Sequence, residues 1–271
     1  MGLPWIESQL REDNGEIEAS EQGVLPQLLS QSGIRGDLHV HTDFTDGSSS
    51  LEQMAEAARA IGYRYIAVTD HSKRIAMAHG LDERRLRIQM EMIDRLNQKF
   101  SDFTVLKGIE VDILEDGTLD LPNTVLKELD LAVCSIHSKF KLSSKEQTRR
   151  IIRAMDNRYF TIFAHPTGRL INRRDPCSYD FAAVFKTVAQ RGCFLEVNSN
   201  PERLDVTDSM CRYAKSFGVR FAVSTDAHCT SDYKNILYGV NQARRGWVEA
   251  GEVVNTRGIV ELLRMIGSLG G

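Results

Sequence analysis

The sequence lacks the features of secreted and membrane proteins. Its five cysteines form no C-x-x-C pair and leave an odd one over, which argues against a disulfide framework and favours a reduced, cytoplasmic protein. No apolar run is long enough to span a bilayer. The first residues lack the basic patch and apolar core of a signal peptide. We therefore expect a cytoplasmic protein without a membrane partner.

An excess of positive charge is also absent, and aromatic residues are few. The net charge is -3, so no global basic field indicates a nucleic-acid binder, and no row of aromatic residues stands out for stacking bases. One stretch is strongly basic, because residues 141–174 carry nine Lys or Arg against two acids. Two interpretations of this stretch are about equally good. It forms either a solvated helix face followed by a loop, or a rim that binds phosphate.

What the sequence does contain is enough apolar material for one large domain. The chain has 271 residues, of which 42% are apolar and 26% are charged. Residues 1–32 are polar and acidic without clear periodicity, which indicates an N-terminal arm or linker with one short helix near residues 21–29. We expect residues 33–271 to form a single domain.

Short β-branched or apolar runs alternate with stretches of helical period from residue 34 onward. The predicted strands are 34–41, 65–70, 104–111, 131–136, 160–164, 193–198 and 220–225. The predicted helices are 50–61, 82–99, 143–157, 179–190, 207–217, 235–245 and 256–266. This alternation predicts an α/β fold with a barrel-like (β/α) arrangement of seven strands, and a doubly wound open sheet is the alternative.

Histidines cluster at the ends of the predicted strands. Five of the seven strands end at or near a histidine, and a sixth ends near Glu110. The carboxyl ends of parallel strands meet on one rim, where active sites are built. His39 and His41 stand two residues apart on a strand, so their side chains point the same way, and Asp226 and His228 repeat this spacing.

Imidazole nitrogens and carboxylate oxygens without cysteine suit Zn, Mn or Fe. The candidate metal ligands are His39, His41, Asp46, His71, Glu110, His137, His165, Asp226 and His228. Nine ligands are too many for one ion, so we predict a cluster of two to three divalent ions. Such clusters stabilise the attacking and leaving oxygens of a phosphoryl transfer and turn bound water into hydroxide.

Five further residues are candidates for substrate binding. They are His79, Lys139, Arg169, Asn198 and Arg203. Arginine suits bidentate phosphate recognition, and lysine acts as a point charge. The alternatives are a loop position for His79, ordinary surface ion pairs for the cations and a loop cap for Asn198.

At these residues the chain resembles the PHP (polymerase and histidinol phosphatase) superfamily. The motifs that carry the resemblance are D-L-H-V-H-T-D-F-T-D-G, T-D-H-S, G-I-E-V-D, S-I-H-S, A-H-P-T-G-R-L and S-T-D-A-H. Further motifs resemble the C-terminal PHP domain of bacterial and archaeal family X DNA polymerases; they are G-L-P-W-I, A-H-G-L-D-E-R-R-L, N-P-E-R-L-D and A-R-R-G-W. The polymerase domain is not in this sequence, so a free-standing relative and an excised domain both fit.

The resemblance implies a distorted seven-stranded, TIM-barrel-like fold with three metal ions. By motif, the first ion would be held by His39, His41, Glu110 and Asp226. Glu110 would bridge to a second ion held by His137 and His165, and the third would be held by Asp46, His71 and His228. The resemblance places His39, His41, Glu110, Asp226 and His228 at the reaction centre.

The first functional hypothesis is hydrolysis of DNA phosphodiesters by metal-bound hydroxide. Family X relatives imply a 3′→5′ exonuclease, with cleavage at abasic sites or 3′ ends in DNA repair and association with a polymerase domain. The second hypothesis is a small-molecule phosphomonoesterase of the histidinol-phosphatase type. The third is a non-catalytic DNA-binding scaffold, which predicts lost ligand residues, and none are lost.

Overall fold

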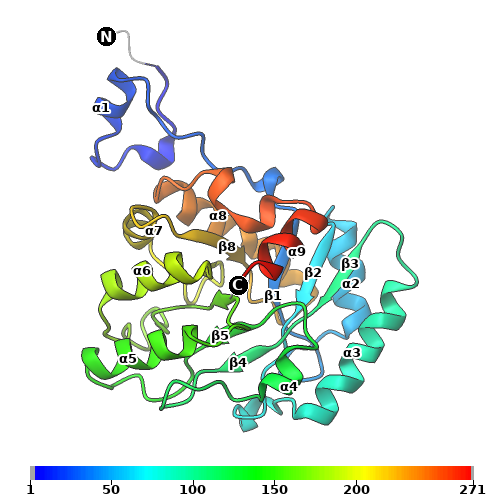
Figure 1. Cartoon of the computed structure of the whole chain (residues 1–271). Coiled ribbons are helices and arrows are strands. Elements are labelled where there is room, and N and C mark those ends of the chain that lie inside the picture. The colour runs from blue at the N-terminus through cyan, green and yellow to red at the C-terminus, as the bar shows by residue number, and fades with distance from the viewer. Residues whose placement is uncertain (1–3, 270–271) are drawn as a thin grey trace.

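Two parallel sheets form the centre of the computed structural model, which describes residues 4–269 (Figure 1). The three-stranded sheet has the order β1 (Gly36–Val40), β2 (Tyr65–Val68) and β3 (Thr104–Lys107). The five-stranded sheet contains β4 (Glu110–Asp112), β5 (Val133–Ser135), β6 (Ile162–Phe163), β7 (Phe194–Asn198) and β8 (Arg220–Ser224). Most strand residues are buried, as expected for parallel strands with both faces covered. The predicted α/β fold with parallel strands is confirmed.

The strand count differs from the prediction at one place. The predicted strand 104–111 is interrupted, so that β3 ends one sheet and β4 begins the other. Gly108 lies at the interruption, where an added Cβ would be 2.7 Å from Thr69 Cγ2 and 2.9 Å from the Val68 oxygen. The chain needs glycine there to pass close to β2. Residues 4–269 therefore contain eight strands in two sheets where the sequence predicts seven in one barrel.

The two sheets meet along two seams. One seam is a parallel bridge between Val40 and Ala227, with a 2.8 Å hydrogen bond from the His41 N–H to the Ala227 oxygen. The other is a parallel bridge between His71 and Glu110. Within each sheet the strands lie in chain order, the residues after β2 bridge to β4, and the end of β1 bridges to the residues after β8. This order is that of a barrel-like arrangement, whereas a doubly wound sheet reverses its strand order.

All seven predicted helical stretches contain a helix. They are α2 (Leu51–Ala60), α3 (Glu83–Asn97), α5 (Ser144–Met155), α6 (Phe181–Arg191), α7 (Asp208–Lys215), α8 (Ile236–Arg245) and α9 (Ile259–Gly267). Side chains cap several of them, because Ser50, Asp82 and Ser143 each accept a hydrogen bond from a backbone N–H of the first turn. The sequence does not reveal the short helix α4 (Asn123–Leu126).

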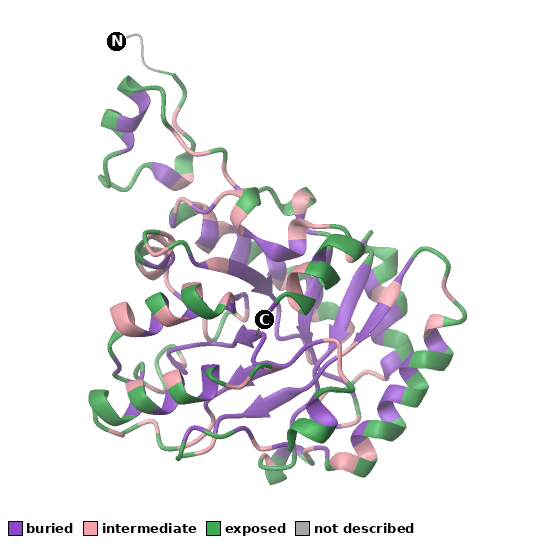
Figure 2. Ribbon diagram, in the orientation of Figure 1, coloured by how far each residue is buried: buried purple, intermediate pink, exposed green. Residues whose placement is uncertain are grey.

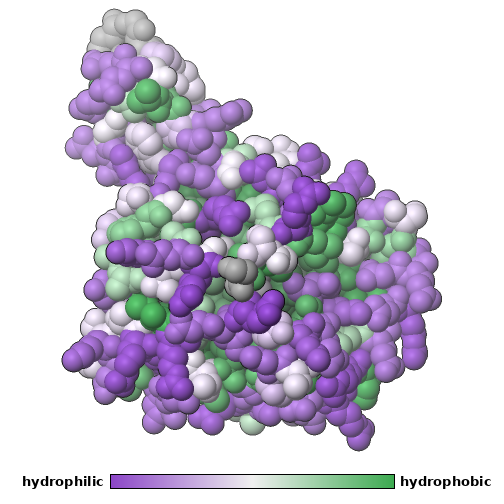
Figure 3. All heavy atoms as spheres, viewed as in Figure 1, coloured by the Kyte–Doolittle hydropathy of each residue, from purple (hydrophilic) through white to green (hydrophobic). Residues whose placement is uncertain are grey.

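Helices cover the outside of the sheets with their apolar faces turned inward, and their outer faces are exposed (Figure 2). Hydrophilic side chains cover most of the face shown in Figure 3. The buried apolar residues form two clusters. One of them contains Leu38, Ala67 and Phe194 from the strands and Leu262 of α9. No helix within residues 4–269 is both long and apolar enough to cross a membrane.

The pairing of β1 with β2 is irregular near His39 and His41. The register against β2 shifts between Asp37 and Val40, which is the signature of a β-bulge. Leu38 consequently belongs to the cluster that contains Ala67, while Val40 belongs to the other apolar cluster. The register shift falls beside His39 and His41, and irregularities of this kind commonly re-aim side chains next to active sites.

The N-terminal arm differs from its prediction. The prediction of a helix near residues 21–29 is wrong, because the helix α1 spans Glu16–Glu21 instead. Gly23 has a φ of 68°, outside the helical region, and a proline follows three residues later. The chain then runs without helix to Leu28, which bridges to Glu249. The arm projects beyond α8 in Figure 1. The division into residues 1–32 and 33–271 remains a prediction.

Candidate metal centre

Nine histidine and carboxylate side chains converge where strands of both sheets end. They fall into four groups whose ligand atoms lie within 4.8 Å of one another. The groups are His41, Asp46, His71 and His228; His39, His41 and Asp226; His39, Glu110 and His165; and His71, Glu110 and His137. These are the nine residues that the sequence singles out, so residues up to 189 positions apart in the chain meet here.

Glu110 lies in the middle of the cluster. Its Oε1 is 2.8 Å from Nε2 of His165 and 3.1 Å from Nε2 of His137. Its Oε2 is 2.8 Å from Nδ1 of His71 and 3.5 Å from Nε2 of His39 and of His41. The two oxygens of one carboxylate therefore face different histidines, which is the arrangement of a ligand shared between ions.

Two further carboxylates flank this centre. The Oδ1 atom of Asp226 is 3.2 Å from Nε2 of His41 and 3.6 Å from Nε2 of His39. Asp46 lies on the other side, with Oδ2 3.2 Å from Nε2 of His71 and Oδ1 3.5 Å from Nε2 of His228. Asp226 Oδ1 is also 3.9 Å from Nδ1 of His228, and Asp46 Oδ1 is also 3.7 Å from Nδ1 of His41, so each carboxylate faces three histidines.

The donor atoms fit divalent cations. Several buried atoms make no hydrogen bond of suitable geometry, although charged neighbours lie close: His39 Nε2, both ring nitrogens of His41, His71 Nδ1, Glu110 Oε2 and His137 Nε2. Burying such atoms without a partner costs free energy, and a cation at the centre would satisfy them together. The sets differ slightly from those that the family resemblance implies, because His39, His41 and His71 each belong to two groups.

The protonation of the cluster follows from its charges. Burial alone would raise the pKa of Glu110, but the positive charges of His71, His137 and His39 hold it well below its usual value. Burial opposes a proton on His71, yet the carboxylates of Glu110 and Asp46 raise its pKa to about 10. Burial and the neighbouring histidines lower the pKa of His41 to about 3. Loading a cation would therefore displace protons from some of these histidines.

A second layer of carboxylates, which the sequence analysis missed, orients the histidines. Glu196 is fully buried, and its Oε1 lies 2.7 Å from Nδ1 of His39, while Oε2 accepts a 2.7 Å hydrogen bond from the His165 N–H. Asp112 accepts a 3.1 Å hydrogen bond from the His137 N–H and lies 3.4 Å from its Nδ1. These contacts direct Nε2 of His39 and His137 toward the centre. A charged residue inside the apolar strand 193–198 is the signal that could have revealed Glu196.

A cavity of about 470 Å³ lies over the cluster. Among the predicted substrate-binding residues, only Arg203 lines it, with Nε 3.4 Å from Oδ2 of Asp226. Asn198 is buried and donates from Nδ2 to Glu196 and Asp226, at 3.1 and 3.2 Å. Asn198 therefore positions carboxylates and does not line the substrate cavity.

The three other predicted substrate-binding residues lie outside the cavity lining. Arg169 donates from Nε to the Arg203 oxygen at 2.7 Å, so it holds the loop that carries Arg203. The exposed Lys139 lies 3.8 Å from Glu115. His79 is exposed at the end of a short 3-10 helix, η3 (Ala76–Ala78). Sequence reasoning missed the cavity residues just before it, from Arg74 to Met77.

The basic stretch 141–174 is partly structural. Arg150 is only 2% exposed. Its side chain donates hydrogen bonds to the backbone oxygens of Leu114 and Ser138, at 2.9 and 2.8 Å. Arg174 lies over the Phe140 ring at 3.9 Å and donates to a backbone oxygen. Together with Arg169, three of its nine cations serve the fold, which weakens the case for this stretch as a continuous phosphate track.

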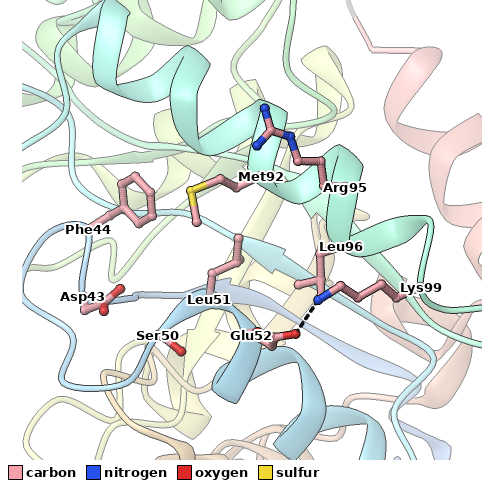
Figure 4. A pocket seen from close by; sticks show the side chains of 9 residues that line it. All are labelled: Asp43, Phe44, Ser50, Leu51, Glu52, Met92, Arg95, Leu96 and Lys99. Atoms are coloured by element: carbon pink, nitrogen blue, oxygen red, sulfur yellow. Dashed lines mark hydrogen bonds and ion pairs between the residues drawn. The ribbon is translucent and has the colours of Figure 1, made fainter.

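A second cavity of about 390 Å³ lies between α2 and α3 (Figure 4). Phe44, Leu51 and Met92 converge at its centre, and Lys99 forms a 2.7 Å ion pair with Glu52 at one end. None of the nine clustered residues lines this cavity. The candidate site is therefore the cavity over the cluster.

The α/β fold and the cluster define the class of metal-dependent hydrolases. The profile of the PHP domain family matches residues 37–200, and the chain belongs to this family. The predicted enzyme class, a metal-dependent phosphoesterase, is confirmed at this level.

Similar proteins are of two kinds. The chain is 40% identical over 261 residues to "DNA polymerase/3'-5' exonuclease PolX" of Bacillus subtilis. The aligned region covers 96% of this chain and 45% of that protein. The chain thus spans about half the length of this relative. It is 28% identical over 232 residues to a "Probable phosphatase" of Thermoanaerobacter, covering 81% of this chain and 89% of that protein.

Among solved structures, a histidinol phosphate phosphatase from Lactococcus lactis, complexed with Zn, L-histidinol and phosphate, has a similar fold. The TM-score is 0.58 at 16% identity, and the match covers 79% of this chain and 94% of that one.

Proposed function

We propose that the chain hydrolyses phosphodiester bonds of DNA from the 3′ end, as a 3′→5′ exonuclease that processes 3′ ends or abasic sites in repair. The observation that carries the proposal is the position of Glu110, whose two oxygens face different histidines. A shared carboxylate within a ring of histidines suits two to three ions of Zn, Mn or Fe. Such a centre suits an ester that carries negative charge on several oxygens.

The nine clustered residues would hold the ions. When bound, these ions would supply an activated water and neutralise the charge that develops on the phosphate. The chain's own residues orient this centre: Glu196 and Asp112 fix the rings of His39 and His137, as described above. Arg203 lines the cavity beside Asp226 and can donate to a phosphate oxygen. We keep His39, His41, Glu110, Asp226 and His228 as the proposed catalytic residues.

The DNA substrate is supported by the 40% identity to a protein named as a polymerase and 3′-5′ exonuclease. Because that match covers 45% of the relative, association with a polymerase domain is part of the proposal. We also propose a cytoplasmic location, since all five cysteines are free and four of them are buried.

A small-molecule phosphomonoesterase is the second candidate. It is favoured by the "Probable phosphatase" relatives, one of which this chain covers over 89% of its length. The same centre would serve both reactions, so the substrate has to be decided by assay.

The test compares end-labelled single-stranded DNA with histidinol phosphate. Purified protein is analysed for metal and assayed with Mn²⁺ or Zn²⁺, with and without chelator. We expect stepwise shortening of DNA from the 3′ end that chelator abolishes. Efficient hydrolysis of the monoester with intact DNA would overturn the first candidate in favour of the second. Gel-shift binding of DNA without any hydrolysis would support the scaffold hypothesis instead.

A further inference from the structure

A short turn beside the cavity presents apolar side chains next to the cluster. The turn comprises residues 74–79, which we call the lip. Ile75, Ala76 and Met77 line the cavity together with members of the cluster. Met77 is 97% exposed, more than any other large apolar side chain within residues 4–269. The lining of the cavity therefore combines charged side chains of the cluster with apolar side chains of the lip.

The backbone of the lip is held by several hydrogen bonds. The N–H groups of Ala78 and Gly80 both donate to the Ile75 oxygen at 3.1 Å. The Arg85 side chain donates to the backbone oxygens of His79 and Gly80. An added Cβ at Gly80 would lie 2.0 Å from the Ser72 oxygen, so the lip packs tightly against the preceding chain.

Because the lip is held in place, a ligand that touches Met77 need not first order the loop. Preorganised contacts of this kind lose less conformational entropy on binding. A lone exposed methionine is unremarkable on a surface, but here it stands at the edge of the cavity over the cluster. Its position therefore bears on what the cavity binds.

A phosphate over the cluster would direct the rest of its ester toward the charged or the apolar part of the cavity lining. Arg203 on the cluster side attracts phosphate oxygens, whereas the lip offers apolar surface to an organic group. Arg74 at the start of the lip is half-exposed and lies 3.6 Å from the half-exposed Glu115. That ion pair is weak in solvent, which leaves the guanidinium free to meet a neighbouring phosphate.

We propose that Met77 packs against the nucleobase adjacent to the cleaved phosphate, while Arg74 contacts the next phosphate along the strand. This inference rests on the proposed function and names a substrate contact within it. A methionine side chain is flexible and polarizable, so it adapts to every base face without reading its edge. The contact therefore strengthens the binding of a DNA strand without imposing a sequence preference.

The experiment uses single-stranded oligonucleotides that carry a tetrahydrofuran abasic residue at the last or next-to-last position. For each, kcat/KM is compared with that of the unmodified strand, using the full chain with Mn²⁺. Wild-type protein should prefer the base-bearing strand at one of the two positions. Met77→Ala should reduce that preference about fivefold, because the contact between the methionine sulfur and the base is lost.

Two variants serve as controls. Met77→Leu keeps an apolar side chain and should retain part of the preference. Met92→Ala removes a methionine from the cavity between α2 and α3 and should leave the preference as in wild type. An unchanged preference in Met77→Ala, or none in wild type at either position, would overturn the inference. Wild-type protein that cleaves no strand at all would instead count against the proposed function.

Discussion

Buried carboxylates occur in two regions of this molecule, and their pKa values are shifted in opposite directions in the two regions. Within the cluster, histidine charges hold the pKa of Glu110 and of Asp226 well below the usual values, although burial opposes this. Outside it, Asp37 and Asp205 are equally buried, and burial raises the pKa of each to about 6. Burial is common to both regions, so the surrounding charges make the difference.

The hydrogen-bond partners of Asp37 and Asp205 are neutral, and the nearby cations (His39 for Asp37, Arg169 and Arg203 for Asp205) lower each pKa by less than burial raises it. Asp37 accepts a 2.6 Å hydrogen bond from the Thr225 hydroxyl and so joins β1 to the end of β8. Asp205 accepts from the hydroxyl and the N–H of Thr167, both at 2.9 Å. Hydrogen bonds favour the ionised form but do not outweigh burial here. The comparison teaches that the cluster is distinguished by positive charge, the property that bound cations would also supply.

The largest effect should come from removing the shared charge. Glu110→Gln keeps the size of the side chain but loses the carboxylate whose two oxygens face different histidines. Hydrolysis should fall on the order of a thousandfold, since ion binding and charge stabilisation are both lost. The measurement is the initial rate on the substrate identified above, together with metal content.

The matched control is Glu128→Gln, because Glu128 forms an ion pair with Arg87 on the surface. This variant should retain wild-type rates. If Glu110→Gln also does, Glu110 is not the centre of the site and the two regions do not differ in function.

The next effect concerns stability and pH. The folded-state pKa of Asp205 is raised above its unfolded value of 3.8 to about 6, so its contribution to stability is full below pH 3.8 and is lost as the pH rises through 6. A shift of this size corresponds to about 3 kcal/mol. The free energy of unfolding of Asp205→Asn should therefore rise relative to wild type by up to about 3 kcal/mol between pH 4 and 7.

Urea unfolding of both proteins at several pH values checks this prediction. Asp116→Asn provides the contrast, because hydrogen bonds from Thr118 lower the pKa of this exposed carboxyl. Its effect should be small and of opposite sign. A difference between wild type and Asp205→Asn that does not change with pH would remove the distinction between the two regions.

Glu196 sharpens the comparison, because it touches the cluster without facing its centre. Glu196→Ala removes the partners of the His39 ring and the His165 N–H. Metal affinity should fall about 10–100-fold, as is typical for groups that orient ligands. Calorimetric titration of metal-free protein with Mn²⁺ gives the affinity, and Glu196→Gln, which retains an oxygen acceptor, should recover part of it. Equal affinity in all three proteins would show that the orientation of His39 does not depend on Glu196.

The sequence predicts the convergence of the cluster well, because strand periodicity and histidine spacing are local properties. It also predicts the helices, whose caps and apolar faces lie within a single segment. It does not reveal the break at Gly108, since that break depends on the approach of β2, which is distant in the chain. It likewise misses Glu196 and the lip, whose roles arise only from neighbours brought together by folding.

The break at Gly108 has a consequence for assembly. It separates His39, His41, Asp46 and His71, which lie in or after β1 and β2, from the five clustered groups that follow, and Glu110 comes two residues later. Neither half of the chain, divided at this glycine, carries a complete set of nine. The proposed ion site can therefore form only once the two halves have docked, and cations bound there would fasten one half to the other.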